Sequence, residues 1–274
     1  MTEVQNAVRK PSIVDSVLKS PLAGLAPWIL LSLVSGPGRF EASAAAALGL
    51  TLLIVAASHR RGSTLKLLGM FDILYFGILA AIGLFASADT IRWFELWGGE
   101  MTNIALVVFA FGSMLLRNPF TLQYAKESAP PETWTTPLFL RINYTITLVW
   151  ALSFTWSAIV GLYGDAVLGN SGNFWTGWIL QLGGMIFAVS FTEWYPEYAP
   201  NKALQALGLP TDPPQPIARL FDFLPVFVVI TGIAGLVTDS VSTAVGIALI
   251  VVGAIAYVIM WRIAARVLPE SDGS

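Results

Sequence analysis

Residues 65–87 read LKLLGMFDILYFGILAAIGLFAS, and only Lys66 and Asp72 carry charge in this run. About 20 apolar residues in a helix cross the ~30 Å hydrocarbon core of a bilayer, so the run predicts a transmembrane helix. Comparable apolar segments recur at 21–36, 41–58, 101–116, 138–163, 174–192, 219–237 and 241–261. The sequence therefore predicts an all-α protein, a polytopic bundle of about eight transmembrane helices surrounded by membrane lipids.

Composition favours the same class and excludes several others. The chain has 274 residues, of which 55% are hydrophobic and 12% charged, whereas about 25% are charged in a typical soluble domain. It has no cysteine and one histidine, His59, which excludes disulfides, thiol nucleophiles and metal sites built from several nitrogen or sulfur ligands. A net charge of -2 implies no nucleic-acid partner. We expect no cofactor, no metal and no enzymatic activity.

Lysine and arginine predict the side of the membrane that each loop faces, because short cytoplasmic loops are enriched in both. If the N-terminus is cytoplasmic and eight spans follow, all of the 15 basic residues except Arg39 and Arg92 lie on the cytoplasmic side. Both termini are therefore expected in the cytoplasm. The first segment is short and ends in the turn Ser35-Gly36-Pro37-Gly38, so a re-entrant path for it is the alternative that would change the number of spans.

The chain is predicted to have five regions. These are a cytoplasmic N-terminal tail at 1–20, a six-helix transmembrane unit at 21–192, a cytoplasmic linker at 193–218, a transmembrane hairpin at 219–266 and a polar tail at 267–274. The linker is predicted from prolines that interrupt any long helix, namely Pro196, Pro200, Pro210, Pro213, Pro214 and Pro216.

One order of features, from about Leu22 to Thr192, extends over most of the predicted six-helix unit. An alanine-rich span at 42–48 leads to the basic pair Arg60 and Arg61, and an aromatic and charged stretch follows at 91–95. After these come Pro119, Lys126, Glu127, Trp134, Asn143 and Trp150. This order resembles the intracellular septation protein A family, and the run from 117 to 150 carries most of the resemblance.

The resemblance implies a multi-pass protein of the bacterial inner membrane. It also implies contacts with envelope-synthesis or division proteins, and it supplies no catalytic residue. The family usually ends near the position of Thr192, whereas this chain adds the linker and two further spans.

Asp72 is the leading candidate for a site within the membrane. It lies about two turns inside the third predicted span, where a carboxylate is costly unless it is neutralised or paired. Tyr75 follows three residues later and is placed to donate a hydrogen bond. One hypothesis is a protonatable or substrate-facing site, and the other is an ion pair with a basic residue such as Arg141.

Further polar groups complete the candidate intramembrane site, namely Asn143, Gln181 and Asp222. An amide inside a bilayer needs a partner on another helix, so Asn143 and Gln181 are also candidates for contacts between helices. Glycine pairs on several spans permit close helix approach, which makes a homo-oligomer one of the expected assemblies. His59 is expected to be a loop residue.

The predicted inner loop from Arg117 to Arg141 mixes charged and aromatic side chains. It is expected to lie on lipid headgroups, to cap the bundle or to bind a partner protein. The residues that would do so are Arg117, Pro119, Lys126, Glu127, Trp134 and Arg141.

Two functions follow from these observations. The first is a non-enzymatic inner-membrane protein that acts through protein contacts in envelope maintenance or cell division. The alternative is a transporter or channel for a small molecule or lipid, in which Asp72, Tyr75, Gln181 and Asp222 face an internal cavity. The surroundings of Asp72 separate the two, because a transporter requires a hydrated polar cavity there, whereas in a scaffold Asp72 is sealed in a pair or turned toward the inner headgroups.

Overall fold

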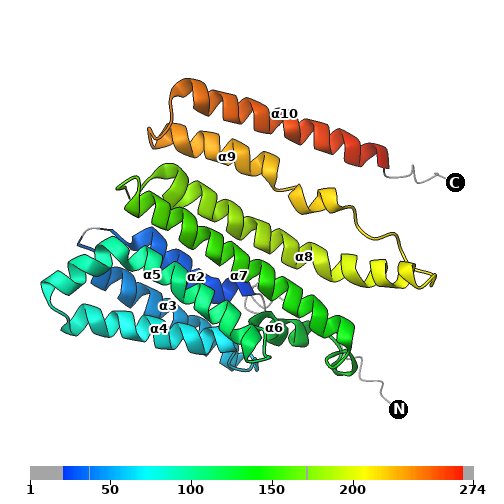
Figure 1. The fold of residues 1–274 in the computed structure, drawn as a ribbon, viewed down its shortest axis with the longest axis horizontal. Helices are drawn as coiled ribbons and strands as arrows, with labels where there is room; N and C mark the ends of the chain where they lie inside the picture. The colour runs from blue at the N-terminus through cyan, green and yellow to red at the C-terminus, as the bar shows by residue number, and fades with distance from the viewer. Residues whose placement is uncertain (1–20, 37, 171, 268–274) are drawn as a thin grey trace, which may run out of the picture. The chain divides into compact units, whose positions relative to one another are not determined.

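A computed structural model describes residues 21–36, 38–170 and 172–267, and these residues form helices without any strand (Figure 1). The predicted all-α class is therefore confirmed. The α-helices are α2 (Pro21–Val34), α3 (Phe40–Arg60), α4 (Leu67–Phe85), α5 (Ala88–Leu115), α6 (Phe120–Ser128), α7 (Pro137–Ala166), α8 (Leu180–Ala206), α9 (Leu224–Val237) and α10 (Thr243–Val267). Three short elements are η1 (Pro131–Thr133), the π-helical η2 (Phe174–Ile179) and η3 (Ile217–Phe221).

Seven helical segments among the described residues are long and apolar enough to cross a bilayer: Phe40–Arg60, Leu67–Phe85, Ala88–Leu115, Pro137–Ala166, Phe174–Ala206, Ile217–Val237 and Thr243–Arg262. The count differs from the eight predicted because α2 has 14 residues, which is about 21 Å at 1.5 Å per residue. The predicted N-terminal tail and residues 268–274 lie outside the described residues, as does the predicted side of both termini.

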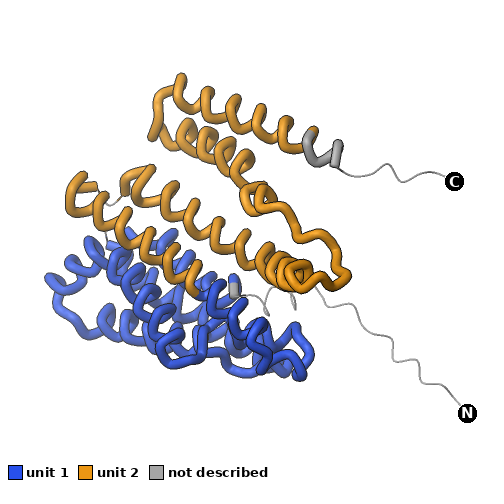
Figure 2. Tube along the Cα trace, turned by 45° about the vertical axis from the view of Figure 1, so that its right-hand side comes forward, with its two compact units in different colours: residues 1–147 blue, residues 148–274 orange. Residues whose placement is uncertain are grey.

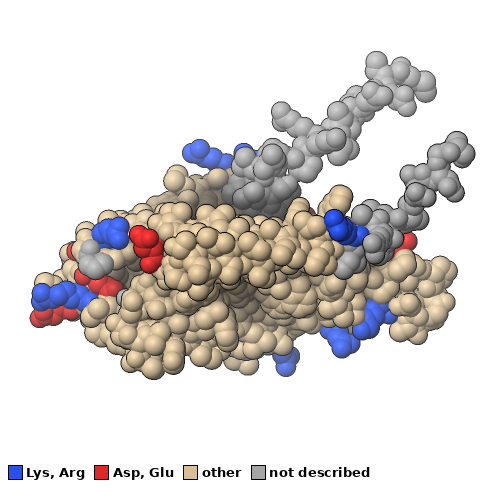
Figure 3. Space-filling view, turned by 90° about the horizontal axis from the view of Figure 1, so that it is seen from above, with Lys and Arg blue, Asp and Glu red and all other residues tan. Residues whose placement is uncertain are grey.

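Large apolar side chains are exposed along these helices. Leu84 is 77% exposed and Leu115 is 83% exposed, and many Leu, Ile, Val and Phe side chains share this property. On the face drawn in Figure 3, uncharged side chains cover most of the surface. Such surfaces suit contact with lipid and not with water. The chain is a multi-pass membrane protein.

The chain forms two compact units, residues 1–147 and 148–274 (Figure 2). The division falls within α7, whereas the sequence predicted it after residue 192. In the first unit α3 packs along α2 and α4, and α4 contacts α5 and α6. Ala44 and Ala47 are fully buried on α3, because small side chains let neighbouring helices approach closely.

The Pro-rich segment is more helical than the sequence predicted. α8 continues through Pro196 and Pro200 as far as Ala206, so the segment without helix begins only after it. Each proline removes one backbone hydrogen bond. Aromatic stacking offsets part of that loss, because the ring centroids of Trp194 and Tyr198 lie 4.3 Å apart on this stretch of the helix.

In the second unit α9 and α10 form an antiparallel hairpin whose backbones nearly touch (Figure 1). A Cβ atom on Gly253 would lie 2.7 Å from the backbone oxygen of Pro225. A Cβ atom on Gly232 would lie 2.8 Å from the backbone oxygen of Gly246. The glycines are therefore required for this close packing.

Candidate functional site

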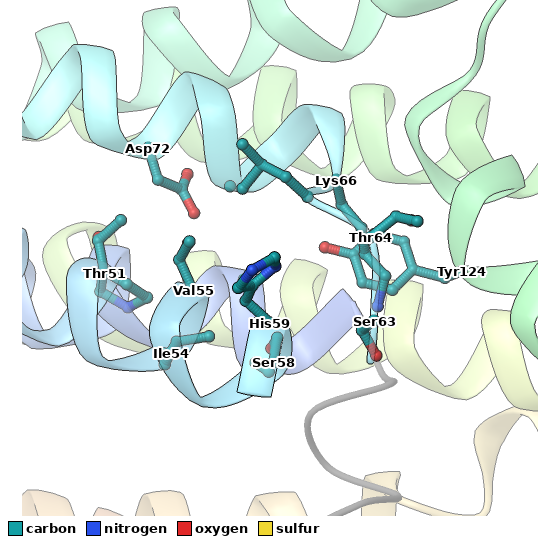
Figure 4. A pocket seen from close by; sticks show the side chains of 15 residues that line it. Thr51, Ile54, Val55, Ser58, His59, Ser63, Thr64, Lys66, Asp72 and Tyr124 are labelled. Carbon is teal, nitrogen blue, oxygen red and sulfur yellow. The ribbon is translucent and has the colours of Figure 1, made fainter. Parts of the chain in front are cut away.

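A cavity of about 360 Å³ lies within the first unit, between α2, α3, α4 and α6. Its volume falls within the ~300–1,000 Å³ of small-molecule sites. Apolar side chains form the middle of its wall, and they include Ala23, Pro27, Ile54, Val55 and Leu65. In Figure 4 polar side chains gather at its two ends. We call the end at Asp72 and Thr51 the acidic end, and the end at His59, Ser63, Thr64, Lys66 and Tyr124 the basic end.

Asp72 is buried at the acidic end, with 2% of its surface exposed. Its Oδ1 accepts a hydrogen bond of 2.7 Å from the indole Nε1 of Trp28 on α2. Within the described part of the chain no cation lies within ion-pair distance of Asp72, and Oδ2 has no donor. The ion pair predicted with Arg141 does not form, because Arg141 is exposed on α7.

Aromatic packing fixes the position of Trp28. Its ring centroid lies 4.8 Å from those of both Tyr75 and Phe76 on α4. Gly24, one turn earlier on α2, permits the close approach, because a Cβ atom there would lie 2.5 Å from Leu68 Cδ2. The donor to Asp72 is thus held by the contact between α2 and α4.

Thr51 faces the acidic end from α3 (Figure 4). It is 1% exposed, and its hydroxyl has no hydrogen-bond partner among the described residues. Buried hydroxyls normally have one. Together with Oδ2 of Asp72, it provides two polar atoms that remain available to a ligand.

Tyr75 lies outside the cavity wall. Its hydroxyl is 3.0 Å from Oγ1 of Thr102 on α5, and Thr102 in turn donates to the backbone oxygen of Gly98 at 2.6 Å. The predicted hydrogen bond between Tyr75 and Asp72 is absent, because Tyr75 is directed toward α5 while Asp72 is directed toward α2 and α3.

His59 lies at the basic end, in the last turn of α3. Sequence reasoning missed it as a cavity residue. The available signal was spacing, since Thr51, Val55 and His59 follow one another at four-residue intervals and therefore share one face of a helix.

Helix α6 joins the basic end to the start of α4 through three side chains. Gln123 Oε1 accepts a hydrogen bond of 2.6 Å from the backbone nitrogen of Leu67. Lys66 Nζ lies 3.1 Å from Glu127 Oε2 and 4.3 Å from the centroid of the Tyr124 ring. These contacts close the cavity along α6.

Tyr124 presents its hydroxyl group as a hydrogen-bond donor at the basic end. Burial raises the pKa of this phenol, and the negative charges of Asp72 and Glu127 act in the same direction. The hydroxyl is therefore protonated at neutral pH.

The remaining intramembrane candidates do not line this cavity. Asn143 is buried, where its Nδ2 donates to Phe139 O at 2.9 Å and its own backbone oxygen accepts a hydrogen bond from Thr121. Gln181, in the second unit, donates through Nε2 to Thr176 O at 2.9 Å. Asp222 is exposed at the end of η3. The structure does not bring these three residues to Asp72.

The candidate loop divides into a packed part and an exposed part. Pro119 is buried and Glu127 pairs with Lys66. Lys126 Nζ lies 5.4 Å from the centroid of the Trp134 ring, and Trp134 donates through Nε1 to Ala129 O at 3.0 Å. Arg117 and Arg141 are exposed and remain available to lipid or to a partner.

No three His, Cys, Asp or Glu side chains in the described ranges lie close enough together to hold a metal ion. No protein-family model, no curated protein and no solved structure matches the chain. The resemblance to the septation protein A family therefore stays a prediction.

Proposed function

We propose that this membrane protein binds a small amine-bearing molecule in the cavity of the first unit and transports it across the membrane. One observation supports this most directly. Asp72 places a buried carboxylate in a cavity, and no cation in the described part of the chain pairs with it. Acids at membrane depth commonly line a substrate or ion pathway, because their burial is costly without a partner.

The chemistry of the acidic end suits an ammonium group. An ammonium carries three donors, and Oδ2 of Asp72 and the Thr51 hydroxyl each offer an acceptor. The ligand would supply the positive charge that the described part of the protein does not place beside Asp72. The apolar wall formed by Ile54 and Val55 would hold the carbon chain of the same molecule.

Binding can be tested with hexylamine, hexanol and hexanoate, which share one alkyl chain. We expect the protein in nanodiscs to bind hexylamine most tightly and hexanoate least, as measured by calorimetry against empty nanodiscs. Asp72→Asn should lower the affinity for hexylamine at least tenfold, which corresponds to about 1.4 kcal/mol. Asp222→Asn is the matched control, because Asp222 is an exposed acid outside the cavity. Equal binding of the three probes, or full affinity in Asp72→Asn, would contradict the proposal.

Transport needs its own test. Hexylamine keeps the N–H donors that the site requires, and it crosses bare lipid only in its neutral form, which carries no charge. The electrical current that a hexylamine gradient drives into proteoliposomes therefore reports uptake of the charged form. We expect uptake with the unaltered protein and loss of it in Asp72→Asn. If amine binding depends on Asp72 but no uptake occurs, the site is one for binding alone and the transport step is wrong.

A non-enzymatic role in the bacterial inner membrane, through contacts with envelope or division proteins, stays a second prediction. Its surface would be the exposed Arg117 and Arg141 rather than the cavity. The two functions can be tested separately, because Asp72→Asn alters the cavity and leaves that surface unchanged.

A further inference from the structure

We infer that the ligand of the cavity is an amine that also carries a neutral oxygen acceptor, an ether or hydroxyl oxygen, which the Tyr124 hydroxyl binds. This inference rests on the proposed function, because the amine of the same molecule occupies the Asp72 site. It narrows the substrate class from alkylamines to amines with an acceptor oxygen at one defined distance from the nitrogen.

The Tyr124 hydroxyl is a buried donor that the described part of the protein leaves unused. Tyr124 lies on α6, is 7% exposed and lines the cavity, into which its hydroxyl group points in Figure 4. Its hydroxyl forms no hydrogen bond with any described residue. The ring is held by Lys66, whose Nζ lies 4.3 Å from the ring centroid. Because buried hydroxyl groups normally have a partner, this donor is available to a ligand.

Two helices give the same separation between this hydroxyl and Asp72. A Cβ atom on Gly24 of α2 would lie 3.0 Å from the Tyr124 hydroxyl oxygen. Trp28, the donor to Asp72, comes four residues after Gly24 on the same helix. Leu68 of α4 also contacts Gly24, and it precedes Asp72 by four residues. Four residues rise about 6 Å along a helix, so the two polar groups lie about one turn apart.

The pKa of Tyr124 agrees with this short separation. Burial is the largest cause of its increase, and the negative charge of Asp72 adds to it. A charge has this effect on a group nearby. The nitrogen and the oxygen of the ligand are therefore expected about 5–6 Å apart. An extended alkyl chain with about three or four carbons between the two atoms spans that distance, because each bond of ~1.5 Å advances the chain by ~1.25 Å.

The charges at this end of the cavity favour a neutral oxygen over a carboxylate. Among the described residues Lys66 is the one lysine or arginine that lines the cavity, and Glu127 pairs with it at 3.1 Å. A carboxylate beside Tyr124 would gain no unpaired cation from that lysine, and the carboxylates of Asp72 and Glu127 would repel it. An ether or hydroxyl oxygen accepts the same hydrogen bond without that repulsion.

Ether analogues of hexylamine test the inference on the unaltered chain. The analogues are 2-propoxyethylamine, 3-ethoxypropylamine and 4-methoxybutylamine, which have as many non-hydrogen atoms as hexylamine and differ in the position of one oxygen. Their affinities are compared with that of hexylamine by calorimetry in phosphatidylcholine nanodiscs, with empty nanodiscs as the blank. We expect 3-ethoxypropylamine and 4-methoxybutylamine to bind about fivefold more tightly than hexylamine, which corresponds to about 1 kcal/mol. The oxygen of 2-propoxyethylamine is too near its nitrogen, and this analogue should gain no affinity.

Two variants and one further probe assign the oxygen to Tyr124. Tyr124→Phe keeps the ring beside Lys66, and it should remove the advantage of the favoured ether amines over hexylamine. Tyr163→Phe is the matched control, because Tyr163 is 51% exposed and does not line the cavity. The probe is 4-aminobutyrate, which carries a charged oxygen at the same distance from its nitrogen, and it should bind more weakly than 4-methoxybutylamine.

The possible failures are distinguishable. If the ether amines bind no more tightly than hexylamine and Asp72→Asn weakens all of them, the inference is wrong and the proposed function stands. If their advantage survives Tyr124→Phe, another donor holds the oxygen and the role of Tyr124 is wrong. If 4-aminobutyrate binds more tightly than 4-methoxybutylamine, the second group of the ligand is an anion and the neutral acceptor is wrong. If no amine binds, the proposed function fails and the inference fails with it.

Discussion

Replacing Trp28 with phenylalanine tests the arrangement on which the Asp72 site depends. The change removes the hydrogen bond of 2.7 Å from Trp28 Nε1 to Asp72 Oδ1 and leaves the carboxylate without a donor among the described residues. Hydrogen bonds to charged groups contribute about 1.5–3 kcal/mol in soluble proteins, and those measured inside membranes reach only about 1.7 kcal/mol. We expect this bond to contribute about 1.5 kcal/mol to the free energy of unfolding.

A double-mutant cycle with Asp72→Leu isolates that contribution. Trp28→Phe alone should cost about 2.5 kcal/mol, which adds to the hydrogen bond about 1 kcal/mol for the lost ring contacts with Tyr75 and Phe76. In the Asp72→Leu background the same change should cost only the ring term, about 1 kcal/mol. The coupling energy is therefore expected to be about 1.5 kcal/mol.

The assay is reversible unfolding in mixed detergent micelles, followed by circular dichroism so that the loss of a tryptophan does not alter the signal. Trp150→Phe is the matched control. Trp150 is also buried and also donates through Nε1, but its acceptor is the Thr192 hydroxyl at 2.9 Å. The coupling energy between Trp150→Phe and Asp72→Leu should be zero within about 0.5 kcal/mol. If the changes in the free energy of unfolding caused by Trp28→Phe and Asp72→Leu simply add in the double variant, the hydrogen bond and the placement of Asp72 are refuted.

Three further predictions concern the cavity and the hairpin. Glu127→Gln should weaken the contact with Lys66 and increase hydrogen exchange of the α6 amides, and unchanged protection would show that the ion pair does not hold α6. Thr51→Val should leave the free energy of unfolding unchanged, because the hydroxyl has no partner among the described residues. The same substitution should lower the affinity for hexylamine severalfold in calorimetry. Gly253→Ala should destabilise the protein by about 1–3 kcal/mol through overpacking when unfolding is measured in micelles. Gly49→Ala, which has open space around it, should not.

The spans could be predicted from sequence because bilayer thickness fixes their length. The run at 65–87 corresponds to α4, Leu67–Phe85, with both ends within two residues. The first span and the linker could not be predicted in the same way. The length of α2 depends on where its helix ends, and the tendency of proline to interrupt helices does not show that α8 continues through Pro196 and Pro200.

Only part of the candidate site could be predicted from the sequence. Asp72 could be singled out, because a charge inside an apolar run is costly whatever surrounds it. Its partner Trp28 comes from a helix 44 positions earlier, and such a contact leaves no periodic signal. Tyr75 was misassigned because a spacing of three residues places two side chains about 60° apart around a helix, enough to direct one toward α5 and the other toward α2.

The position of Lys66 leads to a last prediction, because the chain places a cation just before the helix that carries Asp72 but keeps the two apart. Lys66 immediately precedes α4, and it pairs with Glu127. Leu68 lies one turn before Asp72 on the same face and is buried against Gly24. Leu68→Lys would place an ammonium four residues from the carboxylate, within reach of an ion pair. We expect it to abolish hexylamine binding in calorimetry although Asp72 is intact, because the protein then supplies the charge that the ligand would bring. Leu68→Met keeps the volume and should bind normally. Full hexylamine affinity in folded Leu68→Lys protein would mean that the amine does not pair with Asp72, and the cavity would then bind its ligand through other groups.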